Sequence, residues 1–395
     1  MLNKKTIREV ELKGKRVLVR VDFNVPQDKS GNITDDKRIR EALDTIHFIS
    51  DMGGKVILAS HLGRPAGERN MQFTLAPVAR RLQELLDRHI AFASDCIGKP
   101  TESVISKMKD GDIILLENVR FYKEEEKNDE GFAKKLASLA DVYVNDAFGA
   151  AHRAHASTEG VAKFLPSACG FLMEKELKIM GEAISNPKRP LTVILGGAKI
   201  ADKIGVIDNL LKLADNILIG GGMAFTFIKA MGGSIGKSLL DAENLEYCKN
   251  VLTTAKAKGV KIYIPEDAVS FDAFEEGAKS VICDSGKIKD GWMGVDLGPK
   301  AIKAFNSVVA KSGTIIWNGP VGVFEFSTAS KGTIEVAKAV ASSKAISIIG
   351  GGDTAYAMAK FGFDTKFTHV STGGGASLEL LEGKQLPGVV ALSDK

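Results

Sequence analysis

Short apolar runs alternate with longer amphipathic stretches along this chain of 395 residues. In the first half, runs typical of buried strands are Arg16–Val21, Lys55–Ala59, Asp112–Leu116 and Val142–Asn145, with helix-like stretches such as Ala76–His89 and Glu130–Ala140 between them. In the second half, the strand-like runs are Leu191–Leu195, Asn216–Ile219, Lys261–Pro265, Thr314–Trp317 and Ala345–Ile349. This alternation predicts parallel sheets with helices on both faces. We therefore expect an α/β fold with two doubly wound, Rossmann-like domains.

The chain is too long for one typical hydrophobic core, so two domains are expected. Phe171–Ile184 has the pattern of one helix, and the following SNPKRP is typical of a helix stop. We predict a first domain over 1–172 with 380–395, a hinge helix over 173–189 and a second domain over 190–379. The last apolar segment, Leu386–Leu392, is too hydrophobic for a free tail. It is expected to return to the first domain.

The composition of the chain does not indicate a particular class of binding partner. With 44% hydrophobic and 26% charged residues the chain is typical of a soluble globular protein, and a net charge of +4 gives no reason to expect nucleic acid. The four cysteines are far apart and predict reduced thiols instead of disulfides or a zinc site. No signal-peptide pattern or membrane-spanning run is evident, so we expect a cytoplasmic protein with no membrane partner.

The two halves differ in arginine and glycine content. All 13 arginines lie at or before Arg189, whereas 13 of the 41 glycines precede Pro187 and 28 follow it. Arginine's planar fork suits carboxylates and phosphates. Glycine lets backbone N–H groups close on a phosphate or a flat ring. The first half is therefore predicted to bind a small anion and the second half a nucleotide.

Candidate anion ligands in the first half follow the predicted strands. These are Arg20, Arg38, His61, Arg64, Arg120 and Arg153. Parallel strands present their carboxyl ends at one edge of a sheet, where ligands bind. Asp22 and Asn24 could accept hydrogen bonds from a substrate hydroxyl. His152 and His155 have no companion at metal-ligand spacing, which favours a structural or substrate-contacting role. The acidic EEEKNDE after Lys123 is expected to be a solvated helix start.

In the second half, four strand-like runs lead directly into clustered glycines. They read TVILGGAK, NILIGGGMAF, ISIIGGGDTAY and THVSTGGGAS. Lys199 and Lys203, four residues apart at a predicted helix start, are expected on one face with a polyphosphate between them. Asp353 either caps its helix or holds Mg²⁺ on a nucleotide phosphate, and the sequence leaves both open. Asn318, Pro320 and Glu325 form a loop able to flank a base and ribose.

Ten segments in order along the chain resemble the signature blocks of the phosphoglycerate kinase family. They are RVDFNVP, SHLGRP, LLENVRF, NDAFGAAHRAHAST, GGAKIADK, GGGMAFTF, GWMGVDLGP, WNGPVGVFE, GGGDT and STGGGAS. Together they extend from Arg20 to Ser377. The resemblance implies Mg²⁺-dependent, reversible phosphoryl transfer from 1,3-bisphosphoglycerate to ADP, giving 3-phosphoglycerate and ATP, by a monomer whose first domain binds phosphoglycerate and whose second binds nucleotide.

The resemblance also implies site residues by motif match. For phosphoglycerate they are Asp22, Phe23, Asn24, Arg38, His61, Leu62, Gly63, Arg64, Arg120 and Arg153. For the nucleotide they are Gly197, Lys203, Gly221, Gly222, Gly294, Asn318, Pro320, Glu325, Gly351, Gly352, Asp353 and Thr354, with Asp353 toward Mg²⁺. The catalytic candidates are Arg38, Lys199, Gly373, Gly374 and Gly375.

The lack of an evident acid–base dyad agrees with this reaction. Both acceptors, an ADP phosphate oxygen and a carboxylate, are already ionised, so no general base is needed. Catalysis then depends on positioning, on charge neutralisation and on closure of the two halves around the substrates. A non-catalytic nucleotide-binding regulator would explain the glycines but not the arginines. A dehydrogenase lacks its dinucleotide fingerprint.

Overall fold

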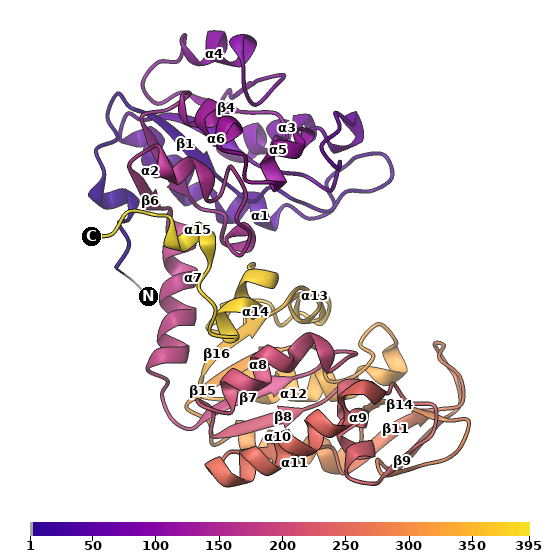
Figure 1. Ribbon diagram of the computed structural model, residues 1–395. Helices are drawn as coiled ribbons and strands as arrows, with labels where there is room; N and C mark the ends of the chain where they lie inside the picture. The colour runs from indigo at the N-terminus through magenta and orange to yellow at the C-terminus, as the bar shows by residue number, and fades with distance from the viewer. Residues whose placement is uncertain (1–2) are drawn as a thin grey trace. The chain divides into compact units, whose positions relative to one another are not determined.

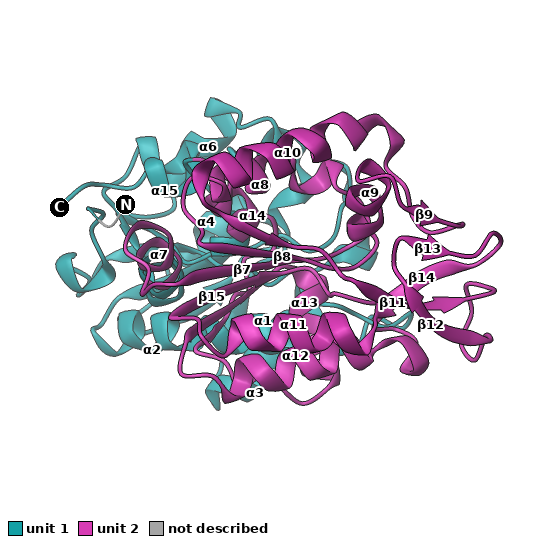
Figure 2. Cartoon of the chain, turned by 90° about the horizontal axis from the view of Figure 1, so that it is seen from below, with its two compact units in different colours: residues 1–178, 385–395 teal, residues 179–384 magenta. Residues whose placement is uncertain are grey.

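The computed structural model describes residues 3–395, which divide into two compact units. Unit 1 comprises the chain up to Lys178 together with Gln385–Lys395, and unit 2 comprises Ile179–Lys384 (Figure 2). Each unit has its own six-stranded parallel sheet with helices around it. The predicted fold class, two doubly wound α/β domains, is confirmed. No helix among residues 3–395 is long and apolar enough to cross a membrane.

The sheet of unit 1 has the strand order β3-β4-β2-β1-β5-β6, and every neighbouring pair is parallel. Its strands are β1 (Arg16–Arg20), β2 (Lys55–Ala59), β3 (Ala91–Phe92), β4 (Ile113–Leu115), β5 (Val142–Asn145) and β6 (Ser167–Cys169). The edge strands β3 and β6 are too short to give a clear sequence pattern. The four inner strands lie within one residue of the predicted runs.

Helices of unit 1 bury both faces of its sheet. They are α1 (Lys37–Glu41), α2 (Leu43–Asp51), α3 (Ala76–Leu86), α4 (Lys99–Ile105), α5 (Lys123–Glu126) and α6 (Glu130–Ala137). Val17 and Val19 of β1 share a buried core with Ile46 of α2 and Leu82 of α3. Leu18 between them is also buried, as expected for a central parallel strand covered on both sides.

The sheet of unit 2 has the order β10-β8-β7-β15-β16-β17 and is also parallel. Its strands are β7 (Leu191–Leu195), β8 (Asn216–Ile219), β10 (Lys261–Tyr263), β15 (Thr314–Asn318), β16 (Ile346–Gly350) and β17 (His369–Val370). Its helices are α8 (Ile204–Leu210), α9 (Met223–Ala230), α10 (Leu245–Lys258), α11 (Pro299–Val309), α12 (Lys331–Ser342), α13 (Gly352–Lys360) and α14 (Gly375–Leu381). Figure 2 shows α8 and α10 on one face of this sheet and α11 and α12 on the other.

Unit 2 also contains two small sheets that the sequence did not predict. β11 (Asp267–Phe271) is the central strand of an antiparallel sheet between β12 (Ser280–Asp284) and β14 (Met293–Leu297). β9 (Ser234–Ile235) pairs with β13 (Lys287–Ile288). Most side chains of β12 are exposed, so the strand lacks the buried run by which the others were recognised. These strands lie together at one end of unit 2 in Figure 2.

Helix α7 (Phe171–Ser185) confirms the helix predicted over Phe171–Ile184, and the division between the two units falls within it, after Lys178. The buried Asp146 caps its start: Oδ1 accepts hydrogen bonds from the N–H groups of Leu172 (2.9 Å) and Met173 (3.2 Å). A carboxylate here satisfies amides that have no partner within the helix. The beginning of α7 is therefore fixed to the end of strand β5.

The C-terminal segment returns to unit 1, as expected. Its short helix α15 (Pro387–Val390) is flanked by Leu386 and Leu392, and both side chains are buried together with Val389. The backbone N–H of Gly388 donates to the carbonyl of Ala151 at 2.9 Å. In Figure 1 this segment, drawn in yellow, lies against the other elements of unit 1.

Candidate active site

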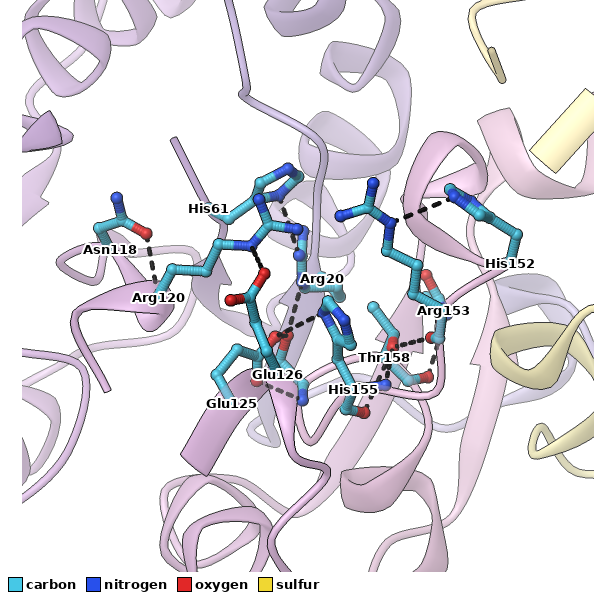
Figure 3. A network of polar contacts seen from close by, with 12 residues as sticks. Arg20, His61, Asn118, Arg120, Glu125, Glu126, His152, Arg153, His155 and Thr158 are labelled. Atoms are coloured by element: carbon cyan, nitrogen blue, oxygen red, sulfur yellow. Dashed lines mark hydrogen bonds and ion pairs between the residues drawn. The ribbon is translucent and has the colours of Figure 1, made fainter. Parts of the chain in front are cut away.

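A cluster of basic side chains lies where four neighbouring strands of unit 1 end. Arg20 ends β1, His61 follows β2, Arg120 lies in a 3₁₀ turn (Val119–Phe121) after β4, and Arg153 follows β5. The strands are adjacent in the order β4-β2-β1-β5, so the sheet brings these residues together. Figure 3 shows Arg120, Arg153, His61 and His155 around Arg20.

Arg20 organises this cluster from below the surface. It is 1% exposed, and its guanidinium donates to Ser157 Oγ at 2.7 Å and to the Val21 carbonyl at 2.5 Å. A third nitrogen lies 3.1 Å from His61 Nδ1. Each of its three nitrogens has a partner inside the protein and the side chain is almost fully buried, so Arg20 supports its neighbours instead of facing a ligand, as its position at a strand end had suggested.

His61 is held as a neutral ring. Burial lowers its pKa well below the ordinary value, the nearby Arg20 and Arg120 lower it further, and Asp22 opposes them. Since a guanidinium can only donate, Nδ1 accepts from Arg20 and the ring proton resides on Nε2. His61 can therefore donate one hydrogen bond to a ligand oxygen from Nε2.

Arg38 on α1 pairs with Asp22 across the end of β1. Burial raises the pKa of Asp22, but the charges of Arg38 and Arg20 and the hydrogen bond from Asn24 N lower it, and the net pKa lies below the usual value. The Asp22 carboxylate is therefore ionised at neutral pH. It fixes Arg38, whose side chain is still 34% exposed.

The loop after β2 is shaped by a close backbone approach. Gly63 has φ +63°, and a Cβ there would lie 2.3 Å from the Phe73 ring. Its N–H donates to Asn24 Oδ1 at 2.8 Å, and its carbonyl accepts from Arg120 at 2.9 Å. Only glycine fits this turn, which presents the next residue, Arg64, to solvent.

Arg64, Arg120 and Arg153 carry the positive charge of the cluster. Arg64 is exposed and has no hydrogen bond or ion pair within residues 3–395. Arg120 is almost fully buried, with Glu126 at 3.4 Å, and burial together with Arg20 lowers its pKa to about 10. Arg153 Nε lies 3.2 Å from His152 Nε2. Glu126 and Glu125 lie near Arg120, whereas Arg64 has no carboxylate within ion-pair distance among residues 3–395, so its positive charge is available to an anion.

Three sequence expectations need adjustment in this region. The EEEKNDE segment is not simply solvated, because Glu125 is fully buried and accepts from Ser157 N (2.8 Å) and Oγ (2.5 Å). Burial raises its pKa. The side chains of Phe23 and Leu62 are buried in the core, so only their backbones can face a ligand.

Unit 2 contains a cavity of about 560 Å³ bordered by its glycine turns. Seven predicted nucleotide residues line it: Gly197, Gly221, Gly222, Gly294, Pro320, Glu325 and Asp353. Lys203, Asn318, Gly351, Gly352 and Thr354 do not line it. The walls therefore come from the carboxyl ends of β7, β8 and β15, the antiparallel strand β14 and the start of α13.

The glycines at these strand ends are required by packing. Gly319 has φ +98°, and a Cβ there would lie 2.2 Å from the carbonyl oxygen of Gly196. Gly221 has φ +65°, and its Cβ would lie 2.7 Å from the backbone of Gly197. Three strand ends thus pack backbone against backbone, which leaves main-chain groups of Gly197 and Gly221 at the cavity wall.

The two predicted phosphate lysines differ in their surroundings. Lys199 is exposed and has no partner within the described residues, whereas Lys203 is partly buried and bonds to Asn318 Oδ1. Burial lowers the pKa of Lys203, while Asp202, Asp353 and Glu382 oppose this. A 3₁₀ turn (Ala201–Lys203) separates Lys199 from α8. The expectation that both share one α-helical face is therefore wrong.

Asp353 lies in the first turn of α13, exposed at the edge of the cavity. The helix follows Gly351, which has φ +86°. The neighbouring Thr354 is buried, and its Oγ1 accepts from Gly319 N at 2.7 Å, which ties the start of α13 to the end of β15. Within residues 3–395, the Asp353 carboxylate accepts no hydrogen bond from the backbone at the start of α13. The capping alternative is therefore not supported.

The glycines before α14 are not equivalent. The N–H of Gly373 already donates to Ser371 Oγ at 3.0 Å, and Ser371 Oγ lies 2.6 Å from Ser377 Oγ. Gly374 has φ +49° and Gly375 begins the helix. Gly373 therefore holds the turn, and Gly374 and Gly375 remain the candidates for donating to a ligand.

Sequence reasoning missed the apolar side of the unit 2 cavity. Phe274 and Phe326 line it with ring centroids 5.1 Å apart, and Leu239, Met293, Val323 and Phe324 line it as well. Phe274 is 62% exposed in a loop between β11 and β12. A large aromatic residue in an otherwise polar, acidic loop (DAFEEG) was the available signal.

Comparison with known proteins covers the chain from end to end. The family model described as phosphoglycerate kinase matches residues 7–384. Relatives named phosphoglycerate kinase include one from Clostridium tetani, 55% identical over 100% of this chain and 98% of its own length, and one from Dictyoglomus turgidum, 56% identical over 99% and 100%. The solved structure of phosphoglycerate kinase from Coxiella burnetii matches with a TM-score of 0.90 at 41% identity, and that from Pyrococcus horikoshii with 0.82 at 34%; both cover 98% of each chain.

Proposed function

We propose a division of substrates between the two units from one premise: the chain belongs to the phosphoglycerate kinase family. Its reaction is therefore reversible phosphoryl transfer from 1,3-bisphosphoglycerate to ADP, giving 3-phosphoglycerate and ATP. The chain is a phosphotransferase. Which residues hold each substrate is the subject of the proposal.

Unit 1 binds the phosphoglycerate through its basic cluster. The observation that carries this assignment is the exposed, unpaired guanidinium of Arg64, which follows Gly63 in the turn that Arg120 holds through the Gly63 carbonyl. A guanidinium fork matches a phosphate or carboxylate with two parallel hydrogen bonds. His61, which donates from Nε2, and Asp22, which accepts, suit the hydroxyl and carboxylate of a glycerate.

Unit 2 binds ADP or ATP in its cavity. The volume of about 560 Å³ suits a ligand of nucleotide size. The base and ribose lie between the apolar side chains and Pro320, Glu325 and Gly294. The phosphates lie toward Lys199 and Lys203 and the start of α13, where backbone N–H groups and the helix dipole favour anions.

The residues present fit a Mg²⁺ ion at Asp353. Magnesium in nucleotide sites is held by one or two carboxylates and by phosphate oxygens, and Asp353 is an exposed carboxylate on the cavity with no competing cap bond. When bound, the ion supplies neutralisation of the charge on the nucleotide phosphates. Asp353 would hold it through its carboxylate oxygens.

The chain's own contribution to the transfer is positioning and charge. Arg38, Lys199 and the N–H groups of Gly374 and Gly375 are the donors proposed to stabilise the moving phosphoryl group. Asp22 holds Arg38 in place for this role, and Gly373 holds the turn that aims its neighbours. No side chain needs to remove a proton, because both acceptor groups are ionised.

We also propose that the chain acts in the cytoplasm as a monomer. Its four cysteines are free thiols, which fits a reducing compartment. All residues assigned here to the two substrates come from one chain, so the proposal requires no second subunit.

A coupled assay tests this function directly. ATP should form from 1,3-bisphosphoglycerate and ADP in the presence of Mg²⁺ and fail to form with EDTA. Isothermal titration with 3-phosphoglycerate separates the enzyme from a nucleotide-binding regulator, since a regulator has no reason to bind the sugar acid. Binding of ADP with no detectable binding of 3-phosphoglycerate would contradict the proposal.

A further inference from the structure

Two aromatic side chains on different segments form one side of the unit 2 cavity. Phe274 lies in the loop 272–279 that joins β11 to β12, and Phe326 lies in the segment that follows β15. Their rings are 5.1 Å apart at an interplanar angle of 54°, and both line the cavity. The shape of this wall therefore depends on how the loop is held relative to the segment.

Glu276 joins the loop to that segment. Its carboxylate accepts from the backbone N–H of Ser327 at 2.8 Å and from Ser327 Oγ at 2.6 Å, with Thr328 Oγ1 at 3.4 Å. Within residues 3–395, every hydrogen bond between the loop 272–279 and the segment 319–330 uses the Glu276 carboxylate. Glu276 is two residues from Phe274, and Ser327 is adjacent to Phe326, so the contact fixes both sides of the aromatic pair.

Other hydrogen bonds hold each partner separately, and Ala278 of the loop and Phe326 of the segment pack against the same buried cluster of Phe271, Val295 and Ala329. The loop closes on itself through Asp272 N and the Lys279 carbonyl, 3.2 Å apart, while Val323 N donates to the Val295 carbonyl at 2.8 Å. Lys360 Nζ donates to the carbonyl of Phe324 at 3.0 Å. Loss of the Glu276 bonds should therefore leave both segments folded and in apolar contact but make their relative position less fixed.

We propose that Glu276 is a positioning residue for nucleotide binding, which acts by holding Phe274 and Phe326 as a preformed wall for the base. The inference rests on the proposed nucleotide site in this cavity. Preorganisation lowers the conformational cost of binding, and a flat base gains most from aromatic rings already in place. Binding of the phosphates, which contact other residues, should not depend on this aromatic wall.

The test compares Glu276→Ala with Glu275→Ala. Glu275 is exposed in the same loop, and its side chain makes no hydrogen bond or ion pair within residues 3–395, so this control removes the same charge without removing the bonds. For Glu276→Ala, the Kd of adenosine and of ADP should rise about fivefold, a modest factor because the lost bonds are exposed to solvent and act on binding only through the aromatic wall. The Kd of tripolyphosphate, the kcat and the KM for 3-phosphoglycerate should stay within about twofold. Glu275→Ala should change none of these quantities.

Ser327→Ala gives an independent check if Glu276→Ala folds poorly. It removes one of the two short bonds, should raise the Kd of adenosine by a smaller factor, and should add little to Glu276→Ala in the double variant. An unchanged Kd for adenosine in both variants would overturn the role of Glu276. Phe274→Ala distinguishes a wrong role for Glu276 from a wrong nucleotide site. If Phe274→Ala also leaves the Kd of adenosine unchanged, the base does not contact this wall and the proposed nucleotide site is wrong.

Discussion

The two units use the carboxyl edge of a similar parallel sheet in different ways. Unit 1 fills its edge with side chains, and Arg20, at 1% exposure, orders a network from which Arg64 projects without a partner. Unit 2 has glycines at this edge. Because they lack side chains, Gly196, Gly221 and Gly319 pack backbone against backbone beside a cavity. One edge presents charge for a small anion, and the other presents space and main-chain groups for a larger, flatter ligand. The comparison teaches that a shared sheet topology fixes where a ligand binds but not how it is recognised.

Removing the C-terminal segment should affect unit 1 most strongly. Deletion from Gln385 onward exposes the contacts of Leu386, Val389 and Leu392, each buried side chain contributing about 2 kcal/mol. Unit 1 should melt at a much lower temperature and kcat should fall, while ADP binding by unit 2 persists. Scanning calorimetry and ADP titration measure both. Val390→Ala, at an exposed position in the same segment, is the matched control, and a melting curve identical to that of the full chain after deletion would refute this role of the tail.

Gly319→Ala should affect unit 2 alone. The new Cβ would meet the Gly196 carbonyl at 2.2 Å and would impose a side chain at φ +98°. We expect a loss of about 3 kcal/mol of unfolding free energy and weaker ADP binding, with 3-phosphoglycerate binding unchanged. Gly259→Ala, which also has positive φ but open space around it, separates backbone strain from the steric clash. Equal destabilisation by both substitutions would show that the close backbone approach is unimportant.

Lys199→Ala should mainly slow the transfer. Loss of one preorganised positive charge should lower kcat by at least about 100-fold, with the Kd of ADP changed far less. Steady-state kinetics beside ADP titration measures the two effects. Lys212→Ala, an exposed lysine of the same unit away from the cavity, should be neutral. A kcat for Lys199→Ala within a few-fold of the parent would remove Lys199 from the catalytic group.

Arg64→Lys and Arg120→Lys should give the smallest but most selective effect. Lysine keeps the charge but loses the fork, so the Kd of 3-phosphoglycerate should rise about tenfold while that of ADP stays constant. Arg64 is the cleaner test, because Arg120 also bonds to the Gly63 carbonyl and supports the turn. Arg80→Lys, on the exposed face of α3, is the control. Weakening of both ligands to the same extent would contradict the division between units.

Sequence patterns predicted the inner strands of both sheets and helix α7 closely, because a buried parallel strand needs an uninterrupted apolar run. They could not predict β12, whose side chains are mostly exposed. Arginine at a strand end predicted the basic cluster, but only the fold separates the buried Arg20 from the exposed Arg64. Four-residue spacing predicted Lys199 and Lys203 on one helix, but in the structure a 3₁₀ turn (Ala201–Lys203) precedes α8, and the spacing alone does not distinguish the two kinds of helix. Phe274 lies in a loop, and in a loop the spacing of residues along the sequence does not predict which side chains line a cavity.

The division of substrates is tested most directly by hydrogen–deuterium exchange with each ligand added alone. With 3-phosphoglycerate, protection should appear in peptides around Asn24, Arg64, Arg120 and Arg153 and be absent from unit 2 peptides. With ADP and Mg²⁺, protection should appear at 196–203, 219–222, 318–326 and 351–354 and be absent from the basic cluster. Protection of the same peptides by both ligands, or protection of the basic cluster by ADP, would contradict the account.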